Sequence, residues 1–267
     1  MRVRLAAHGL GFGYGATPVG RNVDIDLRAG EVLCLLGPNG SGKTTLFKTL
    51  LGLLPVQAGE VVVDGTSLTK LARPDIARRI AYVPQAHTAH FPFRVIDMVV
   101  MGRTAHLGLF ASPTSTDRQR AREALALLGI AQLAEREYTR ISGGQRQLAL
   151  VARALVQDAP AIVMDEPTAN LDFGNQVVVL SEVKRLAARG LAVLLSTHDP
   201  DHAFSIADRV ALLDQGRLVD QGVPQTVLTS DKLKSVYGID VTIGRLANGQ
   251  TVCAPTYRVN PKNNLQA

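Results

Sequence analysis

The sequence predicts an α/β fold built around a mainly parallel β-sheet. Three short apolar runs, at residues 32–36, 161–165 and 191–196, are typical of buried strands. The second and third runs each follow a helical pattern, which is the connection that neighbouring parallel strands require. The first run leads directly into a glycine-rich loop and then into a helical pattern through Leu46 and Leu50. A strand, a loop and a helix in this order begin the core of such a sheet.

The other segments predict two additions to this core. Residues 3–5, 23–27 and 61–63 alternate in hydrophobicity or cluster beside glycine turns, which indicates a smaller antiparallel β-sheet on the N-terminal side. The stretch from about His87 to Val156 lacks strand signals and carries helical patterns, for example over residues 121–128. We therefore expect an α-helical subdomain inserted into the core.

The C-terminal part of the sequence carries weaker signals. Residues 212–219 predict a hairpin with a glycine at its turn. We expect the main domain to span residues 1–230 and a short extension to span residues 231–267. The extension has one hairpin-like stretch near Asn248-Gly249, and its polar tail from Pro261 onward is expected to be disordered.

Composition limits the possible classes of protein. The chain has 267 residues, of which 46% are hydrophobic and 19% are charged, as in an ordinary folded domain. Its sequence has no apolar run near the roughly 18 residues that a membrane-spanning helix needs. The N-terminus also lacks the apolar region of a signal peptide, so we expect the chain to stay in the cytosol.

The charge pattern argues against nucleic acid as a partner. A net charge of +6 would suit an anionic partner, but the arginines are scattered and few aromatic residues lie between them. Cys34 and Cys253 have no metal-binding spacing and are interpreted as reduced structural thiols. Five histidines lack metal-ligand spacing on one element and are interpreted as bystanders: His8, His87, His90, His106 and His202.

The glycine-rich loop after the first core strand has the chemistry of a phosphate site. Its glycines allow successive backbone N–H groups to point into one concavity at a helix N-terminus. Lys43 adds a mobile positive charge, and the Thr44 hydroxyl can ligate Mg²⁺. The predicted nucleotide-binding residues are Gly37, Pro38, Asn39, Gly40, Ser41, Gly42, Lys43, Thr44 and Thr45.

An acidic pair ends the second core strand. Because Glu166 follows Asp165 directly, the two carboxylates can point to different places. Asp165 suits the outer shell of Mg²⁺, and Glu166 suits polarising a water molecule that attacks the γ-phosphate. Such a pair usually marks only a solvated strand end. This strand is predicted to neighbour the glycine loop, however, which favours the catalytic interpretation.

Two more polar residues follow predicted strands. His198 comes after the third core strand, where open α/β sheets place their ligand contacts, and could bind the γ-phosphate or hold Glu166 and the water. Gln85 follows residues 81–84 and could reach Mg²⁺ or the water, although glutamine after proline is common in loops. The predicted catalytic residues are thus Glu166, His198 and Gln85, and the predicted metal ligands are Thr44, Gln85 and Asp165.

Residues 141–145 offer a second phosphate site. Here a serine and two glycines precede an apolar helical pattern, so a hydroxyl and free backbone N–H groups lie at a helix N-terminus. One chain then carries two half-sites. Their simplest use is a head-to-tail dimer, in which this loop of each chain closes over ATP at the Lys43 loop of the other. The predicted contacts are Ser142, Gly143, Gly144 and Gln145.

Tyr14 precedes the glycine loop in the sequence and is a candidate for stacking on an adenine ring. Phe12 competes for the same role. The alternative for Tyr14 is a turn aromatic that covers the small sheet.

Together these motifs resemble the nucleotide-binding subunit of ATP-binding cassette (ABC) transporters, over about residues 3–227. Residues 37–44 are similar to the Walker A motif, residues 161–166 to the Walker B motif with its catalytic glutamate, and residues 141–145 to the family signature. The resemblance implies a P-loop NTPase core, with ATP and Mg²⁺ as cofactors.

Three shorter motifs of the family are also matched. Gln85 is similar to the Q-loop residue, His198 to the switch histidine, and residues 169–172 to the D-loop. The D-loop resemblance implies that Asp172 belongs to the nucleotide site. The signature begins with Ile141 where leucine is usual, and Asn170 stands where the D-loop usually has a small residue.

Residues 93–103 suggest a subfamily. This stretch, followed by His106 and Asp117, is similar to the helical subdomain of importers for iron-siderophores, haem and cobalamin. The resemblance implies a dimer of this chain, two transmembrane permease subunits, and a substrate-binding protein that delivers cargo. It also implies a peripheral position on the cytoplasmic face of the membrane. The alternatives are a molybdate or tungstate importer, and a soluble cassette ATPase of the iron-sulfur assembly type.

The stretch from Arg94 to Leu109 is predicted to contact the permease, and exposed substitutions there to uncouple transport from hydrolysis. Arg103 and His106 are polar residues in an apolar-rich helix, which favours contact with the membrane partner over a place in a core. Its apolar residues could equally pack inside the helical subdomain: Val95, Ile96, Met98, Val99 and Met101.

Overall fold

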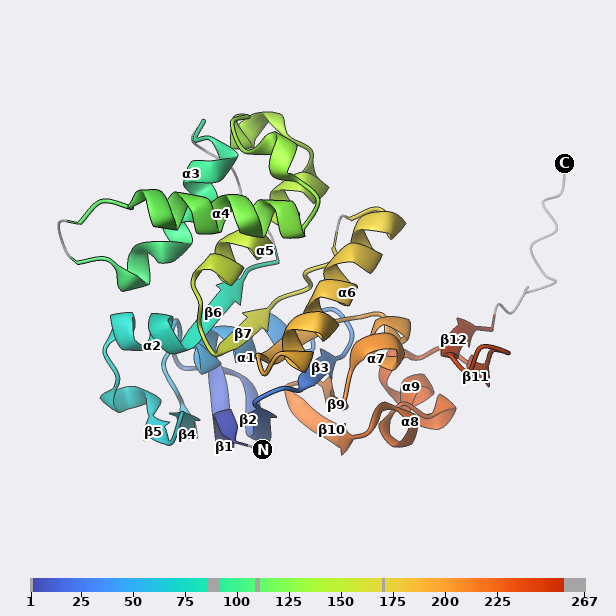
Figure 1. Cartoon of the computed structure of the whole chain (residues 1–267). Coiled ribbons are helices and arrows are strands. Elements are labelled where there is room, and N and C mark those ends of the chain that lie inside the picture. Colours follow the sequence, from blue (N-terminus) through green and yellow to red (C-terminus); the bar gives the residue numbers. More distant parts are fainter. Residues whose placement is uncertain (1, 86–91, 109–110, 170, 257–267) are drawn as a thin grey trace, which may run out of the picture.

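A computed structural model describes residues 2–85, 92–108, 111–169 and 171–256. Its centre is a six-stranded sheet with the order β10-β9-β3-β8-β7-β6 (Figure 1). The five strands from β9 to β6 are parallel, and β10 pairs antiparallel with β9, which confirms the mainly parallel sheet. The strands are β3 (Val32–Leu36), β6 (Ile80–Val83), β7 (Ala161–Met164), β8 (Ala192–Thr197), β9 (Arg209–Asp214) and β10 (Arg217–Gly222).

Both faces of this sheet are covered. Alternate residues of β3 enter two different apolar cores, Cys34 in one and Leu33 and Leu35 in the other. The first core includes residues of α5 (Gly143–Val156), α6 (Phe173–Ala188) and α7 (Pro200–Ile206). Burial on both faces explains why β3, β7 and β8 are apolar at nearly every position.

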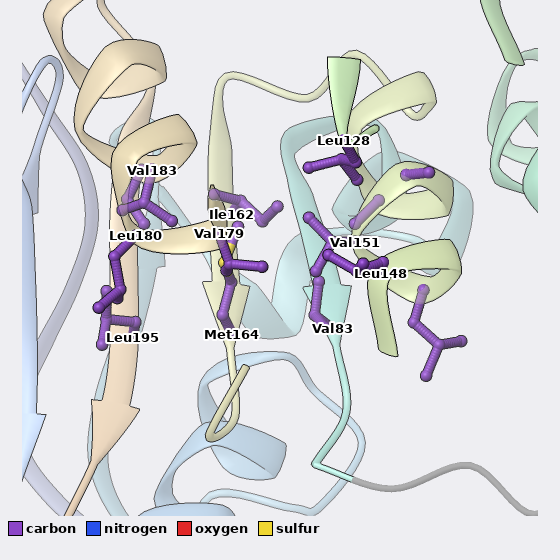
Figure 2. Packing of buried hydrophobic residues seen from close by; sticks show 14 of the residues in the cluster. Val83, Leu128, Leu148, Val151, Ile162, Met164, Val179, Leu180, Val183 and Leu195 are labelled. Carbon is purple, nitrogen blue, oxygen red and sulfur yellow. The ribbon is translucent and has the colours of Figure 1, made fainter. Parts of the chain in front are cut away.

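Figure 2 shows part of the first core from close by. Val83, Met164 and Leu195 come from three neighbouring parallel strands, with Val151 of α5 on one side and Val179 of α6 near them. All five residues are at most 2% exposed, so the helices are fixed to the sheet by tightly packed side chains.

The second core lies between the central sheet and an antiparallel sheet of order β2-β1-β4-β5. Helix α1 (Lys43–Leu50) contributes Leu46, Phe47 and Leu50 to this core. The predicted antiparallel sheet is thus confirmed, with longer strands than expected: β1 (Val3–Tyr14), β2 (Thr17–Arg28), β4 (Ala58–Val63) and β5 (Thr66–Ser67). The sequence underestimates β1 and β2 because register shifts interrupt their alternation.

The helical elements between β6 and β7 lie together at one end of the molecule, above the antiparallel sheet in Figure 1. They are α3 (Val95–Val100), η2 (Met101–His106), α4 (Ser115–Leu127), η3 (Ala131–Leu133), η4 (Tyr138–Arg140) and α5. Two further elements, η1 (Leu68–Lys70) and α2 (Arg73–Arg79), precede β6. The limits of this subdomain and of the main domain remain a prediction. His87, His90, Leu109 and Asn170 lie outside the described residues.

The structure corrects the expectation for Arg103. Its side chain is 11% exposed and pairs with Asp117, with Nε donating to Oδ1 at 2.9 Å. Its Nη1 also donates to the backbone oxygen of Val156 at 2.9 Å. Arg103 therefore ties η2 to α4 and to the end of α5, and it is not an exposed contact residue. Arg103 is a polar residue in an apolar stretch because its partner, Asp117, lies within the same helical subdomain.

The apolar residues of the same stretch also belong mainly to the core. Val95, Ile96, Met98 and Val99 are at most 6% exposed, whereas Met101 is 42% exposed. Gly102 follows Met101, and an added Cβ there would be 2.1 Å from the Arg153 oxygen. Only glycine allows η2 to approach α5 this closely.

The C-terminal elements pack at the other end of the molecule (Figure 1). The predicted β9–β10 hairpin is confirmed, and its turn residues Gln215 and Gly216 have φ of 45° and 73°. The hairpin near Asn248 is also present, as β11 (Val241–Arg245) and β12 (Thr251–Pro255). Two short helices were not predicted, α8 (Pro224–Val227) and α9 (Ser230–Tyr237). The predicted disordered tail lies outside the described residues.

Candidate active site

A glycine loop between β3 and α1 forms one wall of the candidate site. Gly42 precedes α1 with φ of 103°, and Gly40 has φ of 82°, both in the region that favours glycine. At Gly37 the constraint is space, because an added Cβ would lie 2.2 Å from the Leu213 oxygen of β9. The loop borders a cavity of about 330 Å³, lined by Val19, Asn39, Gly40, Gly42, Lys43, Thr44, Thr45, Gln85 and Glu166.

Lys43 is held over the concave side of this loop. Its Nζ donates to the backbone oxygens of Gly37 at 2.7 Å and Pro38 at 3.0 Å. The same nitrogen is 3.5 Å from Oε1 of Glu166, and both side chains are less than 10% exposed. Burial lowers the pKa of Lys43, and the Glu166 carboxylate partly opposes that shift. The ammonium is therefore fixed where an anionic group in the cavity can meet it.

Asp165 and Glu166 are fixed by a serine at the end of β8. The Ser196 hydroxyl donates to Oδ1 of Asp165 at 2.7 Å and accepts from the Glu166 backbone N–H at 2.9 Å. Glu166 has φ of 46°, in the left-handed region, and its carboxylate has other partners than that of Asp165. Asp165 Oδ2 is buried and has no hydrogen-bond partner among the described residues.

Three other predicted residues converge on the Glu166 carboxylate. Oε2 accepts a hydrogen bond from Gln85 Nε2 at 2.9 Å and lies 3.5 Å from Nδ1 of His198, while Oε1 faces Lys43. Gln85, Glu166 and His198 each follow a parallel strand, at the carboxyl edge of the sheet. This edge is where open α/β sheets bind their ligands.

The Ser142 loop lies apart from the cavity lining. Ser142 is the N-cap of α5 and forms a capping box: its Oγ accepts from the Gln145 N–H at 3.2 Å, and Gln145 Oε1 accepts from the Ser142 N–H at 3.0 Å. Ser142 and Gly143 are exposed, while Gly144 and Gln145 are half-buried. Within one chain, these residues present a helix N-terminus to the surroundings and not to the Lys43 loop.

Asp172 and Tyr14 are also outside the lining. Asp172 is the exposed N-cap of α6, where its Oδ1 accepts from the Asn175 N–H at 2.8 Å. Tyr14 ends β1 and is 48% exposed. Neither residue touches a group in this structure that would test its predicted role.

Sequence reasoning missed two residues of the site. Ser196 was read only as part of a strand, although a serine in an apolar run is a signal for a buried polar contact. Val19 of β2 lines the cavity beside Gly42, whose added Cβ would lie 3.1 Å from Val19 Cγ1. Its position depends on how the antiparallel sheet packs over the loop, which no local pattern encodes.

Comparison with known proteins identifies the family of this chain. A sequence profile of the ABC transporter family matches residues 20–169, from β2 through the acidic pair. The chain belongs to the ABC transporter family. Members of this family bind and hydrolyse ATP, and ATP hydrolysis is the activity of this chain.

Two relatives and one solved structure are similar to this chain over most of its length. An uncharacterized ABC transporter ATP-binding protein of Haemophilus influenzae is 44% identical over 87% of this chain and 89% of its own length. The hemin import ATP-binding protein HmuV of Nocardia farcinica is 43% identical over 80% of this chain and 74% of its own length. An inward-facing structure of a putative metal-chelate type ABC transporter matches with a TM-score of 0.83 and 35% identity, covering 96% of this chain and 98% of that one.

The described part of the chain contains no helix that is both long and apolar enough to cross a membrane.

Proposed function

We propose that this chain is the ATP-hydrolysing subunit of an importer that carries a metal chelate, such as an iron-siderophore, haem or cobalamin, across the cytoplasmic membrane. The likeness to a metal-chelate type transporter chain over 96% of this chain supports the proposal most directly. A hemin import relative at 43% identity supports the same class of cargo. In this role the chain lies on the cytoplasmic face of the membrane, bound to permease subunits.

The cavity fits a nucleotide with Mg²⁺. The loop from Gly37 to Lys43 presents backbone N–H groups and an ammonium to the phosphates. Around it lie oxygen donors, the ligands that Mg²⁺ prefers: the hydroxyl of Thr44, the buried and unpartnered Oδ2 of Asp165, and the amide oxygen of Gln85. When bound, Mg²⁺ supplies neutralisation of phosphate charge.

Catalysis is assigned to Glu166 as the residue that polarises the attacking water. Its carboxylate is at the centre of the contacts with Gln85, Lys43 and His198, so an incoming phosphate changes its surroundings directly. His198 holds Glu166 or the γ-phosphate, and Gln85 senses which groups occupy the site. Tyr14 remains the candidate for stacking on adenine.

A second copy of the chain completes the site. Ser142 and Gly143 are exposed, and residues 142–145 are not in the lining of their own chain's cavity, which supports the use of this loop against the nucleotide of a partner. We place Asp172, at the exposed N-cap of α6, in the same interface. Each of two nucleotides then lies between Lys43 of one chain and Ser142 of the other.

The permease is proposed to dock in a groove between the core and the helical subdomain. This groove has a volume of about 820 Å³ and lies between α2, η2 and the end of α1. Apolar side chains and three arginines line it, which suits a short permease segment with an apolar face and an acidic residue. The lining includes Leu53, Ile76, Met101, Leu107, Arg73, Arg78 and Arg153. A binding protein delivers cargo to the permease and does not touch this chain.

Substitution of a groove residue tests this docking. Leu53 is 61% exposed at the groove, so Leu53→Glu is expected to abolish co-purification with the permease from detergent while ATP binding by the chain stays normal. Val219→Glu is the matched control, because Val219 is 46% exposed on β10, away from the groove. Equal recovery of permease with both variants would place the contact elsewhere.

The cargo class is tested with the assembled transporter. ATP-driven uptake of haem, an iron-siderophore or cobalamin into reconstituted vesicles is the expected result. Uptake of molybdate or tungstate alone would replace the metal-chelate assignment. Stable ATP hydrolysis by a chain that binds no permease under any of these conditions would instead identify a soluble cassette ATPase.

A further inference from the structure

Residues 230–255, which we call the C-terminal arm, comprise α9 and the β11–β12 hairpin. In Figure 1 the hairpin lies beside α7, at the end of the molecule away from α3, α4 and α5. Helix α7 begins two residues after His198. The arm therefore packs against the element that directly follows a residue of the nucleotide site.

Two polar contacts join the arm to this region. The Tyr237 hydroxyl, from α9, donates to the backbone oxygen of His198 at 3.5 Å. The Cys253 backbone N–H, from β12, donates to Oδ1 of Asp201 at 2.7 Å. The two acceptors are three residues apart, so the arm holds both sides of the turn that leads from β8 into α7.

Apolar packing supports these contacts. Five arm residues are partly buried against the core that contains Ala203 and Ile206 of α7: Val236, Tyr237, Val241, Ile243 and Cys253. Burial is the largest cause that raises the pKa of Tyr237, and the charge of the nearby Asp199 is the next. The hydroxyl therefore keeps its proton and remains a donor at neutral pH.

The inner side of the same turn is also fixed. The Thr197 hydroxyl accepts from the Asp199 N–H at 3.1 Å, and it lies 3.2 Å from Nδ1 of His202. Asp199 Oδ1 in turn accepts from the Asp201 N–H at 2.8 Å. His202 is 14% exposed and also lies 3.5 Å from the hydroxyl of Thr168, two residues beyond Glu166.

His198 itself has little packing to hold it. Its side chain is 58% exposed, and Nδ1 lies 3.5 Å from the Glu166 carboxylate, near the limit of a useful contact. The position of the imidazole is consequently set by the backbone of the turn. A small displacement of that backbone changes the distance between His198 and Glu166.

We propose that the C-terminal arm is a positioning element for His198, and that Tyr237 is a positioning residue within it. The arm clamps the outer side of the turn while Thr197, Asp199 and His202 fix the inner side. This inference rests on the role proposed for His198 in hydrolysis. Its experimental signature is a loss of turnover that depends on the presence of His198.

Tyr237→Phe removes the hydroxyl and keeps the half-buried ring. In the full-length chain we expect kcat for ATP to fall about twofold, with KM for ATP unchanged, because the bond at 3.5 Å is near the long limit for a hydroxyl donor. Ser235→Ala is the matched control, because Ser235 is exposed on the same helix and, within the described part of the chain, its hydroxyl bonds only the Lys232 oxygen of α9. This control is expected to keep the wild-type kcat.

A double-mutant cycle distinguishes positioning from general support of the fold. In a His198→Ala background, Tyr237→Phe should cause no further loss of single-turnover hydrolysis, because the group that it positions is gone. The same fractional loss in both backgrounds, or no loss in either, would overturn the proposal. Hydrolysis by His198→Ala alone at the wild-type rate would contradict the proposed role of His198 in hydrolysis. This result is distinguishable from a failure of the arm to position His198.

Asp201 gives a second, independent measurement. Asp201→Ala removes the acceptor for the Cys253 N–H and should lower kcat in the same way as Tyr237→Phe. Asp201→Asn keeps an oxygen acceptor at that position and should restore kcat to near the wild-type value. A loss of kcat with Asp201→Asn equal to that with Asp201→Ala would assign the effect to charge, and not to the clamp.

Discussion

At the scale of single residues, Glu166 receives three different side chains on one carboxylate. Lys43 is at 3.5 Å from Oε1, and Gln85 and His198 reach Oε2. Its backbone lies in the left-handed region at φ of 46°, which costs a non-glycine residue about 1 kcal/mol or more. This conformation is stabilised by the Ser196 hydroxyl, which accepts the Glu166 N–H.

Glu166→Gln is expected to retain ATP binding and to lower turnover by about 10²-fold or more, because an amide has the shape of the carboxylate but cannot polarise water. Single-turnover hydrolysis and nucleotide binding measure the two effects separately. Glu60→Gln, at an exposed position on β4, serves as the control for loss of one negative charge. Hydrolysis at the wild-type rate by Glu166→Gln would remove this residue from the catalytic role.

His202 predicts a pH dependence of stability. Burial lowers its pKa below the ordinary value of 6.5, and the Asp199 carboxylate opposes that shift only in part. The unfolded chain therefore binds the proton more readily than the folded chain. The stability that neutral His202 contributes is fully present above pH about 6.5 and is lost as pH falls toward its lower folded pKa.

The measurement compares wild type with His202→Gln by urea unfolding. At pH about 7.5 the substitution should lower the free energy of unfolding by about 0.5–1.5 kcal/mol, since contacts with Thr197 are weakened. The difference should shrink at pH about 5.5. His8→Gln, at an exposed position in β1, is the control for replacing a histidine at the surface. A constant difference at both pH values for His202→Gln would contradict the assignment.

At the scale of elements, Arg103 joins three pieces of the helical subdomain. It bonds Asp117 of α4 and the Val156 oxygen at the end of α5 from its place in η2. Asp117 also caps α4 by accepting from the N–H and hydroxyl of Thr114. The hydrogen bonds from Thr114 are the largest cause that lowers the pKa of Asp117, and the bond from Arg103 is the next; together they lower it to about 2.

Arg103→Gln is expected to lower the Tm of the chain by roughly 3–8 °C, because two buried acceptors lose a charged donor. Arg118→Gln is the matched control: Arg118 is 48% exposed, it pairs with Asp97 at the surface, and its loss should have little effect. Because the folded pKa of Asp117 is depressed, its contribution persists above pH about 4 and disappears toward pH 2. An unchanged Tm for Arg103→Gln would contradict the structural role.

The sequence predicted elements best where a pattern was long or a motif was local. The parallel strands were recognised because burial on both faces leaves them uniformly apolar, as in β3 and β8. Helix α9 escaped notice because it spans only eight residues and buries little besides Leu233. The partner of Arg103 is 14 residues away in another helix, so its burial could not be read from its neighbours.

The same reasoning applies to the candidate site. Residues at strand ends could be placed together because parallel strands align their carboxyl ends, and Gln85, Glu166 and His198 follow that rule. Ser196 and Val19 needed the register between strands and the packing of the second sheet. Those contacts exist only after the whole core has assembled.

At the scale of the whole molecule, the two half-sites predict a specific result for mixed dimers. Suppose that Lys43→Ala and Ser142→Arg are placed on different chains of one dimer. One composite site then carries both lesions and the other carries none. With both substitutions on the same chain, each site carries one lesion.

The split arrangement should therefore hydrolyse ATP at about half the wild-type rate if the sites act independently, and the arrangement on one chain should be nearly inactive. Differently tagged chains, purified in sequence, provide the two mixed dimers for a hydrolysis assay. A dimer of Lys43→Ala with wild type sets the reference for one damaged site. Equal activity of the two arrangements would show that each site belongs to a single chain.

Helix α5 connects the Ser142 loop at its N-terminus with the groove near its C-terminus. Its first turn carries Ser142 as N-cap, and its last turn carries Arg153, which lines the groove and whose carbonyl is covered by Gly102. At 1.5 Å per residue, its 14 residues make a rod of about 21 Å. Because α5 is packed along its length, its two ends keep a fixed separation, and the helix ties the position of Ser142 to that of the groove. Inserting one residue into α5 would rotate Ser142 by about 100° relative to the groove, and the buried residues on one side of the insertion would also turn out of their places in the core.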